Sequence, residues 1–274
     1  MAAIVGHASF ITMLETQDGI SGRSRPLILP AIAAGSLELA VARSTEEIQS
    51  LQRLRYSVFS QEMDAVFPDS SNGIDADHYD PWCEHLIVRE QATRKIVGTY
   101  RLLTPVNAAR LGAYYSESEF DLSALGGMRD QTIELGRSCI HPNYRNGAVI
   151  MLLWAGIANI VRHLKLRYVL GCASVSLRDG GIAAAHVWHE AQRTLAQGLN
   201  LPLLRPHHPY PVKLMDPDQP ARTPPLIKGY LKVGARICGE PAWDPDFNTA
   251  DFPVFLDVDA MDPRYRRHFG MSAD

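Results

Sequence analysis

Strand-like and helix-like segments alternate along this chain, and their order constrains the fold more than any single motif does. The strand-like LELAVA precedes a helix that begins after Ser44 or Thr45, and HLIVRE and KIVGTYRLLTP then form a predicted antiparallel hairpin. The strands QTIELGRSCI and RYVLGCASVS enclose the apolar helix NGAVIMLLWAGIANIVRHLKL. GIAAAHVWHEAQRTLAQGLN predicts a further helix and DFPVFLDV a last strand, whereas LIKGYLKVGARICG fits either type. This order predicts one α/β layered domain.

The domain is expected to span residues 37–274. Residues 1–36 mix apolar residues with Gly and Pro without a clear period, so we expect a peripheral N-terminal arm there. With 274 residues, 46% of them hydrophobic, the chain can bury a sizeable core. It has neither the basic start and apolar run of a secretory signal nor an apolar stretch long enough to cross a bilayer.

Charge and cysteine content narrow the classes of partner. The net charge of -3, from 27 basic and 30 acidic residues, argues against bulk affinity for nucleic acid. The four cysteines are scattered without a CxxC pair, so we expect reduced thiols in a cytoplasmic protein and no metal site. The adjacent His207 and His208, and His186 and His189 on a helix, also lack the spacing of a metal motif.

Glu134 and Arg137 are two opposite charges inside a strand that its apolar neighbours place in the core. Side chains alternate along a regular strand, so the two would point to opposite faces. Gly136 lies between them, and a glycine inside a strand often marks a bulge, whose extra residue would bring both side chains to one face. Two interpretations stay open at this point: a functional site, or a solvated strand end or structural ion pair.

Further charged residues form a pattern that resembles a known family. Taken singly, Arg55 is typical of a helix surface, Asp77 and Asp80 of turns, and Arg101 of a strand. Together, the runs RYSVF, DADHYD, GTYRLL and ELGR resemble the acyl-homoserine-lactone synthases, although MDAVF stands where that family has a tryptophan. The resemblance implies a three-layer fold like that of GCN5-related N-acetyltransferases, with a mixed, mostly antiparallel sheet flanked by helices. The matching residues are Arg55, Phe59, Asp77, Asp80, Arg101, Glu134 and Arg137, of which the first five would bind substrate.

The second half of the chain resembles a different branch of these enzymes. YSESEFDL and PPLIKGYLKVGARICGEPAWDPDFNTADFPVFLDV are similar to the hemolysin-like acyltransferases, which include the L-ornithine Nα-acyltransferases of ornithine-lipid biosynthesis. This similarity extends from about residue 37 to the end. It implies transfer of a 3-hydroxy fatty acyl group from acyl carrier protein to the α-amine of L-ornithine, and peripheral contact with the inner face of the membrane.

Attack of an amine on a thioester requires a proton acceptor and donors for the developing oxyanion. Glu134 is the natural acceptor, directly or through a water. Arg137 and Arg101 would either keep it ionised or bind a substrate carboxylate, and the sequence leaves both roles open. The fold resemblance implies that backbone N–H groups near Ser138 to Ile140 face the thioester, so Ser138 joins Glu134 and Arg137 as a predicted catalytic position.

The acyl donor is expected to bind as a co-substrate, with no permanent cofactor. Helix N-termini attract phosphate, and YRNGAV precedes the apolar helix, so Arg145, Asn146 and Gly147 are predicted to meet the phosphopantetheine of acyl carrier protein. Cys139 invites a covalent acyl-enzyme, but a buried structural thiol explains it as well, and we expect direct transfer. The alternatives are a lactone synthase, another amino-acid N-acyltransferase, a coenzyme A acetyltransferase, or a non-catalytic protein that binds acyl carrier protein or lipid.

Overall fold

A nine-stranded sheet forms the centre of the molecule in the computed structural model, which describes residues 27, 29–67, 73–195, 201–212 and 221–271. Eight strands run in the order β1-β2-β3-β4-β6-β7-β11-β10, and β9 also pairs with β11. Among the strands of this sheet that the structure describes, only β6 and β7 pair in parallel; the other pairings are antiparallel. The strands are β1 (Ile32–Ala34), β2 (Leu37–Val41), β3 (Glu84–Glu90), β4 (Ile96–Leu103), β6 (Thr132–Ile140), β7 (Tyr168–Ser176), β9 (Arg236–Ile237), β10 (Ala242–Asp244) and β11 (Thr249–Asp257).

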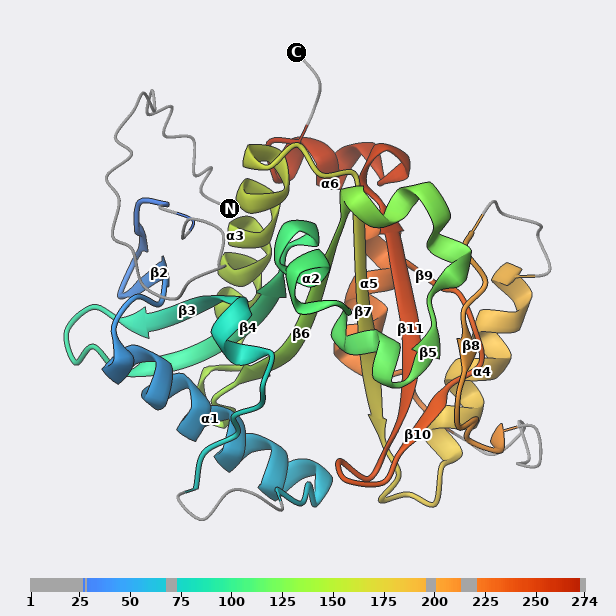
Figure 1. Cartoon of the computed structure of the whole chain (residues 1–274). Helices are drawn as coiled ribbons and strands as arrows, with labels where there is room; N and C mark the ends of the chain where they lie inside the picture. Colours follow the sequence, from blue (N-terminus) through green and yellow to red (C-terminus); the bar gives the residue numbers. More distant parts are fainter. Residues whose placement is uncertain (1–26, 28, 68–72, 196–200, 213–220, 272–274) are drawn as a thin grey trace.

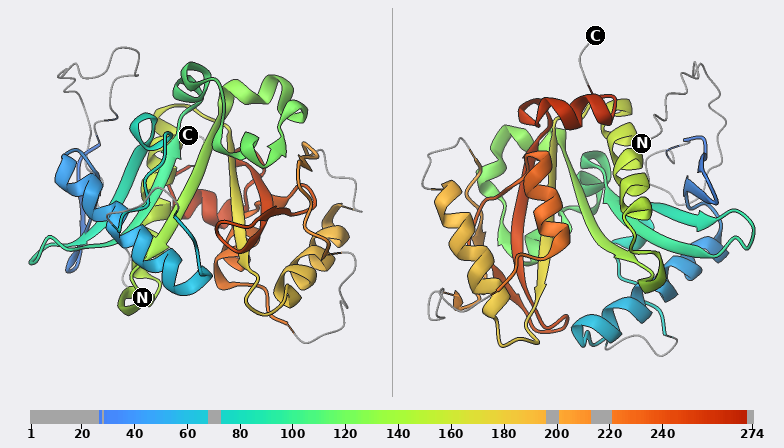
Figure 2. Two further views of the ribbon diagram at one scale, coloured as in Figure 1. Left: turned by 60° about the horizontal axis from the view of Figure 1, so that its bottom comes forward. Right: turned by 180° about the vertical axis from the view of Figure 1, so that it is seen from behind.

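Helices cover both faces of the sheet (Figures 1 and 2). On one face α3 (Ala148–His163) packs on the first half of the sheet, while α4 (Ile182–Leu195) and α5 (Pro225–Val233) pack on the second half. The opposite face carries α1 (Thr45–Met63) and the segment from α2 (Pro105–Leu111) to residue 131. The predicted three-layer arrangement around a mixed, mostly antiparallel sheet is confirmed.

Local sequence signals explain where the principal helices begin. Ser44 caps α1: its hydroxyl accepts a hydrogen bond from the backbone N–H of Glu47, and the Glu47 carboxylate accepts one from the backbone N–H of Ser44. This capping box satisfies two backbone donors at the start of the helix. Helix α3 connects the parallel strands β6 and β7, which no hairpin could join. Its residues Leu153, Ile157 and Ile160 are buried against β2, β3 and β4.

Several elements differ from what periodicity indicates. LIKGYLKVGARICG divides into α5 and β9, and the loops hold α2, two short strands β5 (Phe120–Asp121) and β8 (Arg205–Pro206), and a final helix α6 (Pro263–His268). The predicted boundary after residue 36 falls between the paired strands β1 and β2, so the sheet begins before it. Most of the predicted arm, residues 1–26 and 28, lies outside the described residues. None of the described helices is long and apolar enough to cross a bilayer.

Candidate active site

A bulge in β6 places Glu134 and Arg137 on one face of the sheet, as the glycine between them predicts. Thr99 of β4 lies opposite Cys139, whereas Arg101 lies opposite Gly136, so two residues of β6 face the single residue Tyr100. Arg137 adopts the left-handed backbone conformation, with φ of 50°, which absorbs the extra residue. The prediction that a bulge unites the two charges is therefore confirmed.

Both side chains line one small polar cavity of about 50 Å³. The cavity lies on the α1 side of the sheet, against the segment that follows α2. Its walls come from β4, β6, β7 and β11 and from the two 3₁₀ turns near Tyr79 and Tyr115. The lining residues are Tyr79, Cys83, Arg101, Leu103, Tyr115, Ser116, Glu134, Leu135, Gly136, Arg137, Cys172, Ser174 and Asp251.

Glu134 is buried, with 4% of its surface exposed, and its carboxylate is held by three donors. Its Oε1 accepts hydrogen bonds from the backbone N–H of Ser116 at 2.7 Å and the Ser116 hydroxyl at 2.5 Å, and Oε2 accepts from the Tyr115 N–H at 2.7 Å. Burial raises the pKa of Glu134, although these hydrogen bonds and the charge of Arg101 act in the opposite direction. A fixed carboxylate with a raised pKa suits a general base.

Three arginines and three aspartates beside the cavity form a closed ring of ion pairs. Arg55, with no exposed surface, contacts Asp75 at 3.0 Å and Asp80 at 2.6 Å. Arg101 contacts Asp80 at 2.9 Å and Asp77 at 2.6 Å. Arg137 completes the ring, with its Nη2 3.4 Å from Asp77 and its Nε 3.2 Å from Asp75.

The ring joins α1, the acidic loop, β4 and β6, and its alternating charges compensate one another. Burial disfavours ionised Asp77 and Asp80, but the neighbouring arginines outweigh this and hold the pKa of both carboxyls below the ordinary value. Among the predicted substrate-binding residues, only Arg101 lines the cavity; Arg55, Asp77 and Asp80 lie behind it.

Phe59 and Ser138, which the sequence placed in the same site, occupy other positions. Phe59 is buried in an apolar cluster, where its ring lies 5.7 Å from that of Phe247. Phe247 and Tyr115 in turn flank the Arg137 guanidinium, at 4.5 and 4.9 Å from their ring centroids. The bulge turns Ser138 to the opposite face from Arg137, beside the Tyr100 hydroxyl.

The residues predicted to meet a phosphate lie where β6 leads into α3. Gly147 is the N-cap of α3 with a φ of 94°, and the Asn146 side chain accepts a hydrogen bond from the N–H of Ala148. Arg145 is about half exposed, pairs with Glu62 at 2.6 Å and donates two hydrogen bonds to the Ile140 carbonyl. Cys139 is buried in the Phe59 cluster, where burial raises the pKa of its thiol to about 12.

A second, apolar cavity of about 100 Å³ lies on the other face of the sheet, between α3, α5 and strands β6, β7 and β11. Leu135 and Cys172 line both cavities. Pairing between β6 and β7 ends at Leu135 and Gly171, after which both strands continue apart. A Cβ on Gly171 would lie 2.5 Å from the Leu135 carbonyl oxygen, so this last residue pair between β6 and β7 requires glycine at position 171.

The opening beyond this residue pair exposes backbone polar groups of β6. Cys139 pairs with Thr99 and His141 donates to the Val97 carbonyl, so the alternating pattern turns the Ile140 N–H away from β4. The hydrogen bonds from Arg145 to the Ile140 carbonyl agree with that direction. The predicted separation of β6 from β7 is therefore present, whereas the assignment of a backbone donor there to the thioester stays a prediction.

Several residues in or beside the cavity carried no signal of their own in the sequence. Asp75 closes the ion-pair ring, Tyr115 and Ser116 bind Glu134, and Glu119, Cys172 and Asp251 form the one group among the described residues with the spacing of metal ligands. Tyr115, Ser116 and Glu119 belong to the YSESEFDL run, and Asp251 belongs to the C-terminal run. The two runs meet at the same cavity. Their shared resemblance to one enzyme family was the only sequence signal that pointed to these residues.

Known acyltransferases are similar to this chain in sequence. Residues 54–155 match the model of an acetyltransferase (GNAT) domain. An L-ornithine N(alpha)-acyltransferase of Rhodobacter capsulatus is 33% identical over 252 residues, covering 87% of this chain and 96% of the relative. One from Agrobacterium fabrum is 35% identical over 261 residues, covering 88% of this chain and 87% of the relative. Among solved structures, the acyl-homoserine-lactone synthase LasI has a TM-score of 0.48 at 10% identity, covering 81% of this chain and 89% of that chain.

Proposed function

We propose, because the chain belongs to the L-ornithine Nα-acyltransferase family, that it moves a 3-hydroxy fatty acyl group from acyl carrier protein to the α-amine of L-ornithine. The observation that carries the proposal is the meeting of two unlike cavities at the end of the β6–β7 pairing. The polar cavity offers a base to an amine, and the apolar cavity offers a surface to an acyl chain. A thioester in the opening would present its carbonyl carbon to both.

Glu134 takes the role of general base in this scheme. The α-amine attacks the thioester carbonyl and gives up a proton, which Glu134 accepts directly or through a water. The three hydrogen bonds from Ser116 and Tyr115 fix the carboxylate toward the cavity. We assign the developing oxyanion to the Ile140 N–H, which the alternating pattern turns away from β4. The thiol of the carrier's phosphopantetheine then leaves, so transfer is direct.

Arg137 is the group that we assign to the carboxylate of the acceptor amino acid. It lines the cavity with Glu134, and a guanidinium matches a carboxylate in shape and charge. Tyr115 and Phe247 hold its guanidinium plane, while Asp75 and Asp77 balance part of its charge. Arg101 lies next to it on the cavity wall, and Arg55, Asp77 and Asp80 act as positioning residues behind it.

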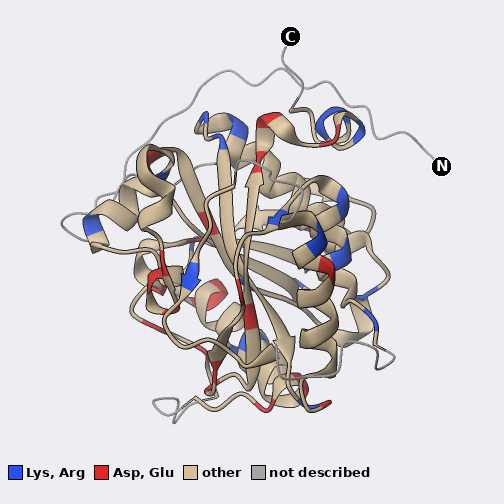
Figure 3. Ribbon diagram, turned by 90° about the vertical axis from the view of Figure 1, so that its right-hand side faces the viewer, with Lys and Arg blue, Asp and Glu red and all other residues tan. Residues whose placement is uncertain are grey.

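The donor side of the proposal involves the start of α3. Arg145, Asn146 and Gly147 precede the helix N-terminus, where a single phosphopantetheine phosphate would find N–H donors and the exposed face of Arg145. An acidic carrier-protein surface would meet the same arginine. Because the product is a lipid, we also propose peripheral contact with the membrane. Figure 3 shows basic and acidic residues on several elements of this side of the molecule.

The direct test is acyl transfer by the purified protein. Incubation with 3-hydroxyacyl carrier protein and ornithine should release the carrier thiol and yield an amide at the α-nitrogen, identified by mass spectrometry. Glycine as acceptor and acyl coenzyme A as donor serve as comparisons in matched reactions. A lactone product, equal use of glycine, or thiol release without any amide would contradict the proposal.

A further inference from the structure

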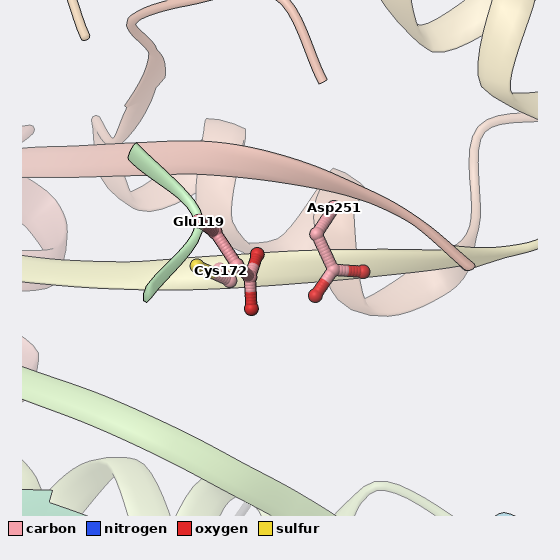
Figure 4. A group of neighbouring side chains, drawn as sticks. All are labelled: Glu119, Cys172 and Asp251. Carbon is pink, nitrogen blue, oxygen red and sulfur yellow. The ribbon is translucent and has the colours of Figure 1, made fainter. Parts of the chain in front are cut away.

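Two carboxylates lie close together at the polar cavity: Asp251 lines it, and Glu119 lies beside Asp251 and Cys172. Glu119 follows the 3₁₀ turn Tyr115–Ser118, and Asp251 belongs to β11. One ligand atom each of Glu119, Asp251 and Cys172 lies within 4.8 Å of the other two. Figure 4 shows the two carboxylates pointing the same way beside the thiol on β7. Three separate segments therefore bring two carboxylates and one thiol close together.

The Glu119 carboxylate lacks the strong donor that a buried acid requires. Both of its oxygens are buried, and the weak Cys172 thiol is the one donor beside them among the described residues, at a geometry looser than an ordinary hydrogen bond. Asp251, which is 4% exposed, accepts a hydrogen bond from the Thr249 hydroxyl at 2.7 Å and also interacts with the Ser174 hydroxyl. Burial raises the pKa of both acids, that of Asp251 to about 6, and a nearby carboxylate adds to each shift: Asp251 for Glu119, and Asp244 for Asp251. Buried acceptors in folded proteins almost always have a donor, so a cationic ligand would complete this pair.

Asp251 of the acidic pair and Glu134 line one cavity, and Glu119 lies beside Asp251 and Cys172 at its edge. Asp251 and Cys172 line the cavity that Glu134 and Arg137 also line. The Ser116 hydroxyl joins its two ends, because it lies 2.5 Å from Glu134 Oε1 and 3.4 Å from Cys172 Sγ. Ornithine carries its second amine three methylene groups beyond the α-carbon, so one ornithine molecule can present its α-amine to Glu134 and its side-chain ammonium to another wall of the same cavity, which Asp251 lines.

We infer that Glu119 and Asp251 bind the side-chain ammonium of the acceptor and so select a basic amino acid over a neutral one. The inference rests on the proposed acylation at Glu134. An ammonium between two carboxylates forms charge-assisted hydrogen bonds and supplies the missing donor. A site built to bind a substrate N–H group discriminates strongly against an analogue that lacks it, because its own polar groups then stay unpaired.

The experiment compares ornithine with norvaline, which has the same carbon chain without the side-chain amine. Wild-type protein should prefer ornithine by ~100-fold or more in kcat/KM. Asp251→Asn and Glu119→Gln should each lower that preference at least ~10-fold, mainly through a higher KM for ornithine, while kcat/KM for norvaline changes little. Norvaline acylation thus reports an intact active site. Asp246→Asn, an exposed acid in the same hairpin, should keep the wild-type preference.

Three outcomes would overturn the inference. The first is an unchanged preference in both variants. The second is an equal loss of activity on both amino acids, which indicates a structural role. The third is abolition of wild-type activity by a chelator with rescue by a divalent metal, since that cation would then occupy the acids. If the wild type acylates norvaline as well as ornithine, amide formation stands but this inference fails; if it acylates neither, the proposed function itself fails and the inference with it.

Discussion

Glu134 and Arg137 line the same cavity although an unbroken strand would send them to opposite faces of the sheet. The extra residue opposite Tyr100 brings them together, and the left-handed backbone of Arg137 makes room for it. Bulges recur near active sites because they re-aim a side chain without ending the strand. In this protein the bulge places the hydrogen-bonded carboxylate of Glu134 and the guanidinium of Arg137 on one wall, beside the point where pairing between β6 and β7 ends.

Replacing Glu134 with glutamine should lower kcat by ~100-fold or more, because the amide cannot accept the proton of the attacking amine. Carrier-thiol release at saturating ornithine measures the effect. Asp130→Asn, which changes an exposed carboxylate four residues earlier, is the control and should keep wild-type turnover. Wild-type turnover in a folded Glu134→Gln protein would remove Glu134 from the chemistry.

The acid limb of the pH profile should report the raised pKa of Glu134. Burial raises that pKa, so kcat/KM should fall at a pH above the ordinary glutamate value of about 4.3 as the carboxylate becomes protonated. Ser116→Ala removes a hydrogen bond to the charged form and should move the limb to higher pH. The ionisation of the substrate amine is the same in both proteins, so a limb that does not move would contradict this assignment.

The sequence predicted the framework and the centre of this site from different signals. Alternation and helical periodicity predicted β2, β3, β4, β6, β7, β11 and the helices α1, α3 and α4. Gly136 predicted the bulge, because a glycine within a strand often marks a bulge or a close backbone approach. The helix α5 could not be distinguished from a strand, since its short apolar pattern fits both.

The partners of Glu134 and Arg137 were not predictable from local patterns. Asp75 looks like any turn residue in an acidic loop, and Ser116 lies in a loop without periodicity. Asp251 alternates with apolar residues in β11, so the pattern gives it no special role. Their contacts depend on long-range packing between segments that lie far apart in the chain. The N-terminal arm and the residue roles in catalysis stay predictions.

The ion-pair ring should contribute strongly to stability. Arg55→Met removes one of three cations and leaves Asp75 and Asp80 buried with less compensation, which should cost ~3–5 kcal/mol in the free energy of unfolding. Arg53→Met, on the exposed face of the same helix, should change it by less than ~0.5 kcal/mol. Urea titration of both variants gives the comparison, and equal stability would show that the ring contributes no net stabilisation.

Gly171→Ala should disturb the point where β6 and β7 separate. The new Cβ would lie 2.5 Å from the Leu135 carbonyl oxygen, so the strands must shift, at a cost of ~1–3 kcal/mol. Gly127→Ala, where the Cβ meets no atom within 4 Å, is the matched control. Thermal unfolding of the two variants tests the expectation. A Gly171→Ala protein as stable as the control would mean that the pair of Leu135 and position 171 tolerates a wider separation.

Filling the apolar cavity should shorten the preferred acyl chain. Ala158 of α3 lines this cavity and is buried, so Ala158→Leu occupies space that the distal methylenes of a long chain would use. Each methylene denied burial loses about 0.8 kcal/mol, which is roughly fourfold in affinity. The kcat/KM ratio of long to short 3-hydroxyacyl carrier proteins should therefore fall at least ~10-fold. Ala155→Leu, on the same helix but outside the cavity lining, should leave the ratio unchanged. A general loss of stability lowers kcat/KM for long and short donors alike and leaves their ratio unchanged. If an active Ala158→Leu protein keeps the wild-type ratio, the acyl chain therefore binds elsewhere.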